Sequence, residues 1–360
     1  MTPGESDLWF LPLGGCGEIG INMNLYGHAG NWLMVDCGIG FDRDTKPPRV
    51  IAPDPDFIAS RRQSLAGLVI THVHEDHIGG VQYLWPELRC PVYCTPFAAV
   101  VLERKLAEVG LLDTVPIHVI PPDASFKVGA FQLRWVGLTH STPECQALEI
   151  ETPAGRVFHT GDWKLDPEPL VGPAYSEASL KAVGDRGVRA LVGDSTCATV
   201  PGRTPSEASL REGLAQIVRK APGRVVVVCF GSNIARLKTL VNVGRDHGRY
   251  TGLLGRSLYN NVRAARASGY WPDSDVLIDP QHLGFLPPAE VLAIATGSQG
   301  EPRAALARLT AGTHPALDLE AGDTVLFSAR RIPGNEEAVQ RLREHLESRE
   351  ITVIEAEDSD

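Results

Sequence analysis

The stretch THVHEDHIGG (residues 71–80) places three histidines and two carboxylates within six consecutive positions. It directly follows the apolar run Leu68-Val69-Ile70, which predicts a buried strand. His72 and His74, just past the strand end, can converge on one metal ion, while Asp76 and His77 in the next turn can reach a second. A solvated polar turn or a helix cap is the alternative. We favour a metal site because three imidazoles lie beside acidic oxygens.

Two further candidate ligands also follow expected strands. His140 comes after the apolar stretch 131–138, and Asp162 comes after the stretch 157–160. Asp162 could bridge two cations because a carboxylate has two oxygens, and two cations about 3.5–4 Å apart promote hydrolysis. His159 falls inside its strand, so we expect a core residue or a support for the ligands.

Composition sets the outer limits of the interpretation. The chain has 360 residues, of which 43% are hydrophobic, and a formal charge of −10. Two domains are expected, and any nucleic-acid contact would need a local groove or bound metal. The seven cysteines are an odd number without a repeating pattern, which favours reduced thiols. With no signal-like N-terminus and no long apolar run, we expect a cytoplasmic protein with no membrane partner.

The order of elements predicts an α/β protein in two parts. Up to about residue 195, short strand-like segments dominate, with helices expected at 97–109 and 176–183. The segment Thr204-Pro205-Ser206-Glu207 reads as a capping box that opens a helix. Beyond it, strands (225–230, 291–295, 325–328) alternate with helices (234–245, 302–309, 336–347), which predicts a parallel sheet covered by helices. We therefore expect domains 1–200 and 201–360.

The segment Gly15-Cys16-Gly17-Glu18-Ile19-Gly20 matches the dinucleotide-binding pattern G-x-G-x-x-G, with Asp36 as a candidate ribose ligand. A dinucleotide site needs a helix that begins inside the glycine loop. Residues 22–36 instead read as a hairpin of two apolar strands. We expect these glycines to form a tight turn beside the metal cluster.

The order of the histidines and aspartates resembles the signature of the metallo-β-lactamase superfamily, which implies a four-layer αββα sandwich with metals at strand ends. Longer segments resemble ribonuclease J: FLPLGGCGEIG (10–20), HSTPE (140–144), HTGDWK (159–164) and DST (194–196). GSNIAR (231–236), GRS (255–257), ATGSQGEP (295–302) and IPGNE (332–336) are similar to the β-CASP domain of that family, an inserted nucleic-acid-binding domain.

The resemblance implies a ribonuclease with two Zn²⁺ ions, Mn²⁺ being a possible substitute. It implies that single-stranded, 5′-monophosphorylated RNA is degraded in the 5′ to 3′ direction and also cut internally. Residues 1–200 would form the metallo-β-lactamase domain and residues 201–360 the β-CASP domain. Asp76 is expected to orient the nucleophile, and Asp194 to support the histidines. The implied ligands are His72, His74, Asp76, His77, His140 and Asp162.

The turns after the strands of the second half are the expected RNA contacts. Gly297, Ser298 and Gln299 precede an expected helix N-terminus, where backbone N–H groups could hold phosphate. Ser232 and Asn233 could donate hydrogen bonds, and Arg236 could pair with a phosphate oxygen. Helix capping by the serines, and a surface salt bridge for Arg236, are the alternatives. The weaker candidates are Arg256 and Ser328.

The sequence departs from ribonuclease J near its end. The family's Ser-Gly-His and His-Gly-Glu motifs are not found, and the second supplies a ligand of one metal. We therefore expect an incomplete C-terminal return of the sandwich, weaker binding of the ion held by Asp76, His77 and Asp162, impaired activity and weakened homo-oligomerisation. The alternatives are a hydrolase of small thioesters or lactones, and an inactive RNA-binding subunit.

Overall fold

The computed structural model describes residues 2–42, 45, 49–332 and 334–355. The chain divides into two compact units, Met1–Pro205 and Ser206–Asp360. The sequence predicts its domain boundary nearby, at residue 200.

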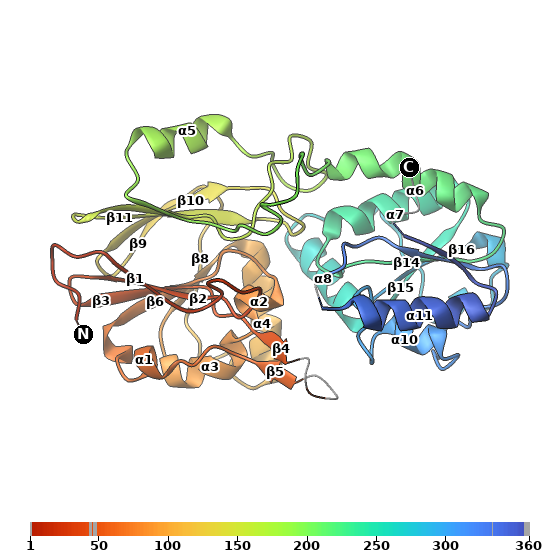
Figure 1. Cartoon of the computed structure of the whole chain (residues 1–360), viewed down its shortest axis with the longest axis horizontal. Coiled ribbons are helices and arrows are strands. Elements are labelled where there is room, and N and C mark those ends of the chain that lie inside the picture. Colours follow the sequence, from red (N-terminus) through yellow and green to blue (C-terminus); the bar gives the residue numbers. More distant parts are fainter. Residues whose placement is uncertain (1, 43–44, 46–48, 333, 356–360) are drawn as a thin grey trace. The chain divides into compact units, whose positions relative to one another are not determined.

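The first unit contains two stacked sheets with helices on their outer faces (Figure 1). The first sheet has the order β1-β2-β3-β6-β7-β8 and the second the order β13-β12-β11-β10-β9. Helices α1 to α4 cover the first sheet and α5 covers the second (Figure 1). The strands are β1 Trp9–Gly14, β2 Met23–His28, β3 Asn31–Val35, β6 Leu65–Val69, β7 Val92–Cys94, β8 Ile117–Val119, β9 Ser125–Val128, β10 Phe131–Gly137, β11 Gln146–Thr152, β12 Gly155–His159 and β13 Ala190–Val192. The helices are α1 Asp56–Ala59, α2 Glu75–Ile78, α3 Val81–Leu88, α4 Pro96–Glu108 and α5 Glu177–Asp185; a small sheet pairs β4 Gly40–Asp42 with β5 Arg49–Ile51.

Side chains from every second position of the strands point inward and fill the space between these two sheets. Leu33 and Val35 of β3 pack in one buried cluster with Leu133, Trp135 and Leu148 of the second sheet. Period-two alternation places these apolar residues on the inner faces. The metallo-β-lactamase αββα arrangement expected from the sequence is confirmed.

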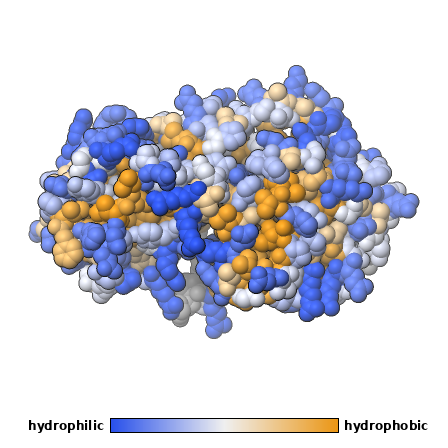
Figure 2. All heavy atoms as spheres, turned by 180° about the vertical axis from the view of Figure 1, so that it is seen from behind, coloured by the Kyte–Doolittle hydropathy of each residue, from blue (hydrophilic) through white to orange (hydrophobic). Residues whose placement is uncertain are grey.

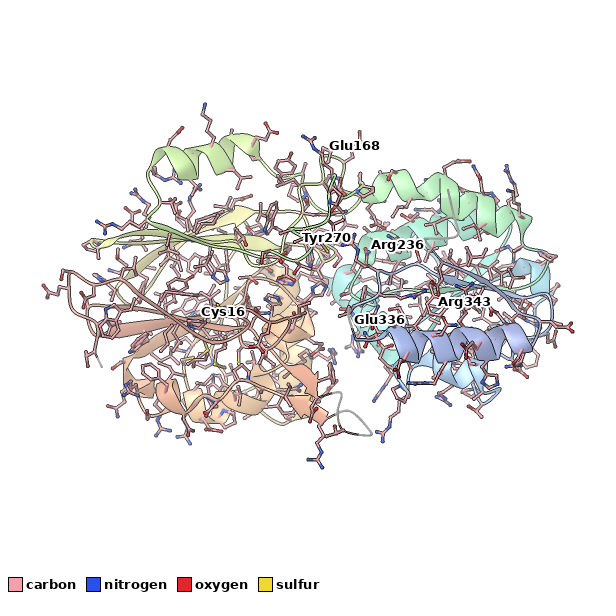
Figure 3. The ribbon with its side chains drawn as sticks, in the orientation of Figure 1. Cys16, Glu168, Arg236, Tyr270, Glu336 and Arg343 are labelled. Atoms are coloured by element: carbon pink, nitrogen blue, oxygen red, sulfur yellow. The ribbon has the colours of Figure 1, made fainter. Side chains whose placement is uncertain are left out.

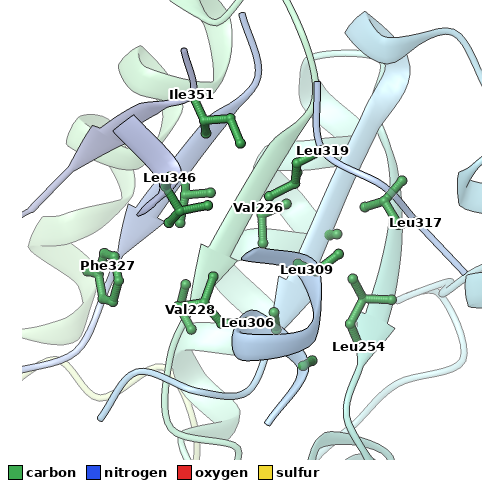
Figure 4. Packing of buried hydrophobic residues seen from close by; sticks show 14 of the residues in the cluster. Val226, Val228, Leu254, Leu306, Leu309, Leu317, Leu319, Phe327, Leu346 and Ile351 are labelled. Carbon is green, nitrogen blue, oxygen red and sulfur yellow. The ribbon is translucent and has the colours of Figure 1, made fainter. Parts of the chain in front are cut away.

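The second unit is one parallel sheet in the order β15-β16-β14-β17-β18. Its central strand, VVVV, is buried at every position, as expected for a parallel strand covered on both faces. Val226 and Val228 pack against Leu306 and Leu346 from two helices on one face (Figure 4). The strands are β14 Val225–Val228, β15 Tyr250–Leu254, β16 Val291–Ala295, β17 Thr324–Phe327 and β18 Thr352–Ile354. The helices are α6 Leu210–Lys220, α7 Ile234–Asp246, α8 Arg256–Ala267, α9 Pro280–Leu283, α10 Ala305–Thr310 and α11 Glu336–Ser348.

Two helix starts differ from the sequence-based expectation. The Ser206 hydroxyl, rather than Thr204, accepts the capping hydrogen bond from Ala208 N, and a short 3₁₀ turn precedes α6. Helix α10 begins at Ala305, whereas the sequence predicts a start at residue 302. An irregular loop therefore separates Gly300 from the helix.

The surface is mixed in character. Seen from behind, apolar residues gather in several patches among hydrophilic ones (Figure 2). Scattered exposed apolar side chains are usual for folded proteins. Across the described residues, no helix is both long enough and apolar enough to cross a membrane.

Candidate metal centre

The first group of candidate ligands gathers beyond the carboxyl ends of β6, β10 and β12. His72 Nε2 lies 3.0 Å from His74 Nδ1, and His140 Nε2 lies 3.2 Å from the same atom. Asp162 Oδ2 lies 3.9 Å from His72 Nε2 and 3.7 Å from His140 Nε2. One donor atom from each residue falls within 4.8 Å of every other. Four metal-binding atoms thus converge on one point.

A second group shares Asp162 with the first. Its other oxygen, Oδ1, lies 3.2 Å from His77 Nε2. Asp76 Oδ2 lies 3.6 Å from the same nitrogen. The sequence placed Asp162 as the bridging carboxylate, and the structure gives it one oxygen toward each group.

Backbone contacts fix the loop that carries these residues. Cys37 N donates to His77 O at 2.7 Å, and Ile39 N donates to Glu75 O at 3.0 Å. A Cβ at Gly38 would lie 1.7 Å from Asp76 O, so only glycine fits there. Asn22 N donates to Asp76 O at 3.0 Å. The loop is therefore held from two sides.

The glycine-rich segment 15–20 leads to Asn22, whose backbone holds the metal-binding loop, and it starts no helix. Gly15, Gly17 and Gly20 have φ of 80°, 76° and 93°, and β2 and β3 form the expected hairpin. A Cβ at Gly20 would lie 3.8 Å from that of Asp76. The expected tight turn beside the metal cluster is confirmed, and the dinucleotide interpretation is excluded.

Asp36 is a functional residue that the sequence analysis missed. Its side chain is fully buried, and its carboxylate accepts hydrogen bonds from Thr71 N, Thr71 Oγ1 (both 2.8 Å) and His77 Nδ1 (2.7 Å). Because Nδ1 of His77 faces Asp36, Nε2 is the nitrogen that faces the metal group. The available signal was an aspartate at the end of a strand, which was weighed only as a ribose ligand.

Other contacts orient the remaining imidazoles. His72 Nδ1 lies 3.0 Å from Thr71 Oγ1, and Ser141 Oγ lies 3.1 Å from His74 Nε2. His159 Nδ1 lies 2.9 Å from the Tyr26 hydroxyl inside the core, as its position within the strand suggested. These partners leave Nε2 of His72 and Nδ1 of His74 to face the first group.

Burial and nearby charges shift the pKa values of the candidate ligands in different directions. Burial lowers the pKa of His72, and it lowers the pKa of His140 to about 3. Burial opposes protonation of His77, but the charges of Asp162, Asp36 and Asp76 outweigh it and raise its pKa, so a metal ion would have to displace the proton on its Nε2. Burial raises the pKa of Asp162, yet the nearby histidines lower it further, so the carboxylate is ionised.

This donor set fits a divalent transition metal. Neutral imidazole nitrogens and carboxylate oxygens are ligands that Zn²⁺ and Mn²⁺ accept. Each group brings imidazole nitrogens and carboxylate oxygens together, and a cation would reduce the repulsion between the carboxylates of Asp76 and Asp162. The His/Asp cluster can therefore hold metal.

Asp194 does not lie where the sequence placed it. Its carboxylate accepts a hydrogen bond from Thr196 N at 2.7 Å and thus stabilises its own turn. Within the described ranges, its side chain reaches no histidine. Asp36 occupies the supporting position instead, because it ends a strand adjacent to β6.

The expected RNA contacts all lie at the carboxyl edge of the parallel sheet in the second unit. They follow β14, β15, β16 and β17, which the topology places side by side. Such edges are where open α/β sheets bind ligands. The residues are Ser232, Asn233, Arg236, Arg256, Gly297, Ser298, Gln299 and Ser328.

Several of these side chains form hydrogen bonds or ion pairs within the protein. Arg236 (Figure 3) pairs with the Glu207 carboxylate and donates to Ser328 O at 2.7 Å, and it also contacts Ser328 Oγ. Arg236 and Glu207 are each only 11% exposed. Arg236 thus forms a largely buried ion pair that joins α7 to the 3₁₀ turn before α6 and to the loop after β17, and its expected contact with phosphate stays a prediction.

Two other expected RNA contacts also have partners within the protein. Asn233 accepts from Arg236 N at 3.0 Å, so it caps α7. Gln299 donates to Arg330 O at 2.9 Å and accepts from Ile332 N and Asn335 Nδ2. Its side chain therefore holds the 330–335 loop. Helix α10 has six residues, and its first N–H groups are already used: Ala305 N donates to Thr296 Oγ1 at 3.2 Å and Leu306 N to Thr296 O at 2.9 Å. Arg256, at the start of α8, is exposed.

Comparison with known proteins agrees with this architecture. Residues 31–228 match the family model of the beta-lactamase superfamily domain. The chain therefore belongs to that superfamily. Residues 222–346 match the ribonuclease J beta-CASP domain, so the resemblance seen in the sequence is confirmed.

Individual relatives point the same way. The chain is 42% identical to Ribonuclease J of Sinorhizobium meliloti over 97% of its own length and 63% of that protein. It is 37% identical to Ribonuclease J of Synechocystis over 96% of its length and 55% of that protein. The chain thus spans about half to two thirds of these relatives. A crystal structure of a protein of unknown function from Enterococcus faecalis shares the fold, with a TM-score of 0.64 at 14% identity, covering 97% of this chain and 88% of that one.

Proposed function

We propose that the protein is a metal-dependent ribonuclease that hydrolyses phosphodiester bonds of RNA. The observation that carries this proposal is the pair of ligand groups that share Asp162. Two-metal sites of this type are typical of enzymes that cleave phosphate esters. The ribonuclease J relatives support RNA as the substrate.

We assign one ion to His72, His74, His140 and Asp162, and a second to Asp76, His77 and Asp162. Zn²⁺ suits the nitrogen-rich first group best, and Mn²⁺ is the proposed substitute. When bound, the ions would activate water and stabilise negative charge on the phosphate. The second group has three donors, so it is the weaker of the two.

The protein's own residues hold and orient the reacting groups. Asp76 and Asp162 have side chains 31% and 30% exposed, whereas those of His72 and His77 are almost fully buried. The two carboxylates thus face the solvent from which substrate arrives. Asp76 is the proposed acceptor that orients the attacking water. Asp36 and Thr71 keep the imidazoles in the required tautomers.

The finer features of the substrate remain proposals. We propose single-stranded, 5′-monophosphorylated RNA, degraded in the 5′ to 3′ direction with additional internal cuts, by a cytoplasmic enzyme. The exposed Arg256 at the start of α8 and the polar residue Ser232 after β14 are the proposed phosphate contacts of the second unit.

Metal content and RNA degradation, measured together, test the proposal. We expect about two Zn²⁺ or Mn²⁺ per chain by elemental analysis, and loss of 5′-monophosphorylated RNA over time. Asp162→Ala should abolish cleavage and release metal. Asp113→Ala, which removes an exposed carboxylate of the same unit, is the matched control. Full metal loading without Asp162-dependent cleavage would reject the nuclease.

Measurements on the same samples distinguish two alternative functions from the ribonuclease. An inactive RNA-binding subunit would bind RNA with one ion or none and would not cleave it. A hydrolase of small thioesters or lactones would turn over those substrates, and 5′-monophosphorylated RNA would not compete.

A further inference from the structure

A pocket on the first unit lies outside the metal centre and outside the proposed RNA contacts. It has a volume of about 360 Å³ and lies between the β11–β12 turn and the segment 187–189. Its charged lining residues are Glu151, Arg156 and Arg189. The pocket therefore has its own recognition chemistry.

Arginines outnumber carboxylates around this pocket. Arg134 Nε and Arg186 Nη2 each donate to Glu149 at 2.8 Å, and Arg156 Nε lies 3.8 Å from the same carboxylate. Glu151 pairs with Arg156 at 2.5 Å. Three guanidinium groups thus share two carboxylates, and Arg189 adds a fourth guanidinium that pairs with neither, although the whole chain carries a formal charge of −10. This local excess of positive charge favours an anion.

Two N–H groups in the arginine cluster are left unsatisfied. Arg134 Nη2 and Arg156 Nε are buried and have no hydrogen-bond partner. Because both atoms are enclosed, they contribute positive charge near the pocket and not a direct contact with a ligand. Arg156 lines the pocket and its Nη1 donates to Arg186 O at 2.6 Å, which fixes the guanidinium at the pocket wall.

Arg189 completes the pocket from the other side. A Cβ at Gly155 would lie 2.6 Å from Arg189 Cδ, so the missing side chain at Gly155 lets the arginine stem lie on the turn. Gly155 has φ of 139°, which other residues rarely adopt. Within the described ranges, the Arg189 guanidinium makes no hydrogen bond or ion pair. Its donors are available to a ligand.

We propose that this pocket binds a phosphate group, held between Arg156 and Arg189. Guanidinium groups bind phosphate through paired N–H···O contacts, and two arginines facing one pocket suit the tetrahedral anion. The phosphate group belongs either to the backbone of bound RNA or to free inorganic phosphate. The first source rests on the proposed function. The site would hold RNA away from the cleavage centre.

Two titrations of the metal-loaded chain test the site. Inorganic phosphate is followed by ³¹P NMR, and a phosphorothioate-linked single-stranded RNA, which resists hydrolysis, is followed by fluorescence anisotropy. Arg189→Gln is the main variant because this side chain supports no other residue. Glu151→Gln removes the carboxylate that competes for Arg156, and Arg62→Gln changes an exposed arginine of the same unit as a control.

We expect Arg189→Gln to weaken phosphate binding by about tenfold. Glu151→Gln should tighten it, and Arg62→Gln should leave it unchanged. If RNA is the source, Arg189→Gln also lowers RNA affinity and reduces its salt-dependence slope by about 1. An RNA affinity that is unchanged while phosphate binding falls assigns the site to the free anion.

Phosphate affinity that is equal in Arg189→Gln and in the unmodified chain overturns the proposal, as does the lack of saturable phosphate binding. The phosphate titration needs no catalysis. A chain that binds phosphate through Arg189 but cleaves no RNA would therefore refute only the proposed ribonuclease activity.

Discussion

At the scale of single residues, Asp36 has the largest predicted effect on metal binding among the supporting groups. Asp36→Asn keeps the size of the side chain and tolerates the observed φ of 63°. It removes the negative charge that fixes His77 Nδ1. We expect metal affinity to fall by about 10- to 100-fold, measured by zinc competition with a chelator.

The matched control for this variant is Asp113→Asn, an exposed aspartate of the same unit. Unchanged zinc affinity in Asp36→Asn would show that the Asp36 carboxylate does not support the metal centre.

His159 gives the metal-free chain a pH-dependent stability. Burial lowers its pKa from 6.5 to about 4, so the unfolded state binds the extra proton between these values. The free energy of unfolding therefore falls as the pH drops from 6.5 toward 4, by about 1.4 kcal/mol per pH unit at the steepest point. His159→Gln should flatten this dependence in urea unfolding with chelator present. Identical pH profiles for the two chains would contradict this.

At the scale of elements, the sequence predicts a strand well where its apolar side chains are buried in a core. The hairpin β2–β3 and strands β14 and β16 match their apolar patterns. Helix α8 was missed, although Leu258, Val262 and Ala265 lie on one buried face. The sequence analysis treated its first residues, Arg256 and Ser257, only as a loop motif.

Elements that depend on distant contacts could not be read from local sequence. The loop before α10 is held by Gln299, whose partners lie more than 30 residues away. In the metal centre, ligand identity followed from residue type and strand ends, and the two groups came together as expected. Arg236 forms its ion pair with Glu207, and no local sequence pattern links these two residues.

Helices α2 and α4 are joined by one ion pair that positions the metal-binding loop. Lys105 of α4 is 6% exposed and donates to both oxygens of Glu75, at 2.6 and 2.8 Å. Glu75 is 53% exposed and lies between His74 and Asp76. Glu75→Ala leaves a buried ammonium unpaired, whereas Lys105→Met leaves a carboxylate that water can reach.

We therefore expect Glu75→Ala to lower the free energy of unfolding by about 1–3 kcal/mol, and Lys105→Met to lower it by less. Urea denaturation of both variants measures the order. A larger loss in Lys105→Met would mean that packing of the lysine stem, rather than its charge, is the stabilising contribution.

At the scale of the whole molecule, the two units have separate hydrophobic cores. All candidate metal ligands lie between residues 72 and 162, in the first unit. The second unit has its own buried cluster around β14 and β17. Metal binding should therefore stabilise the first unit directly.

Metal removal should consequently act on one unit. We expect a chelator to lower the melting temperature of the first unit and to leave that of the second unchanged, because ligand present at about 100 times its Kd adds about 2.7 kcal/mol to the unit that binds it. Trp271 is the one tryptophan beyond residue 205, so Trp271→Phe makes tryptophan fluorescence report the first unit alone. Calorimetry of the unmodified chain follows both units. A single transition that shifts as a whole on chelation would show that the two units unfold together, and metal binding would then stabilise the entire chain.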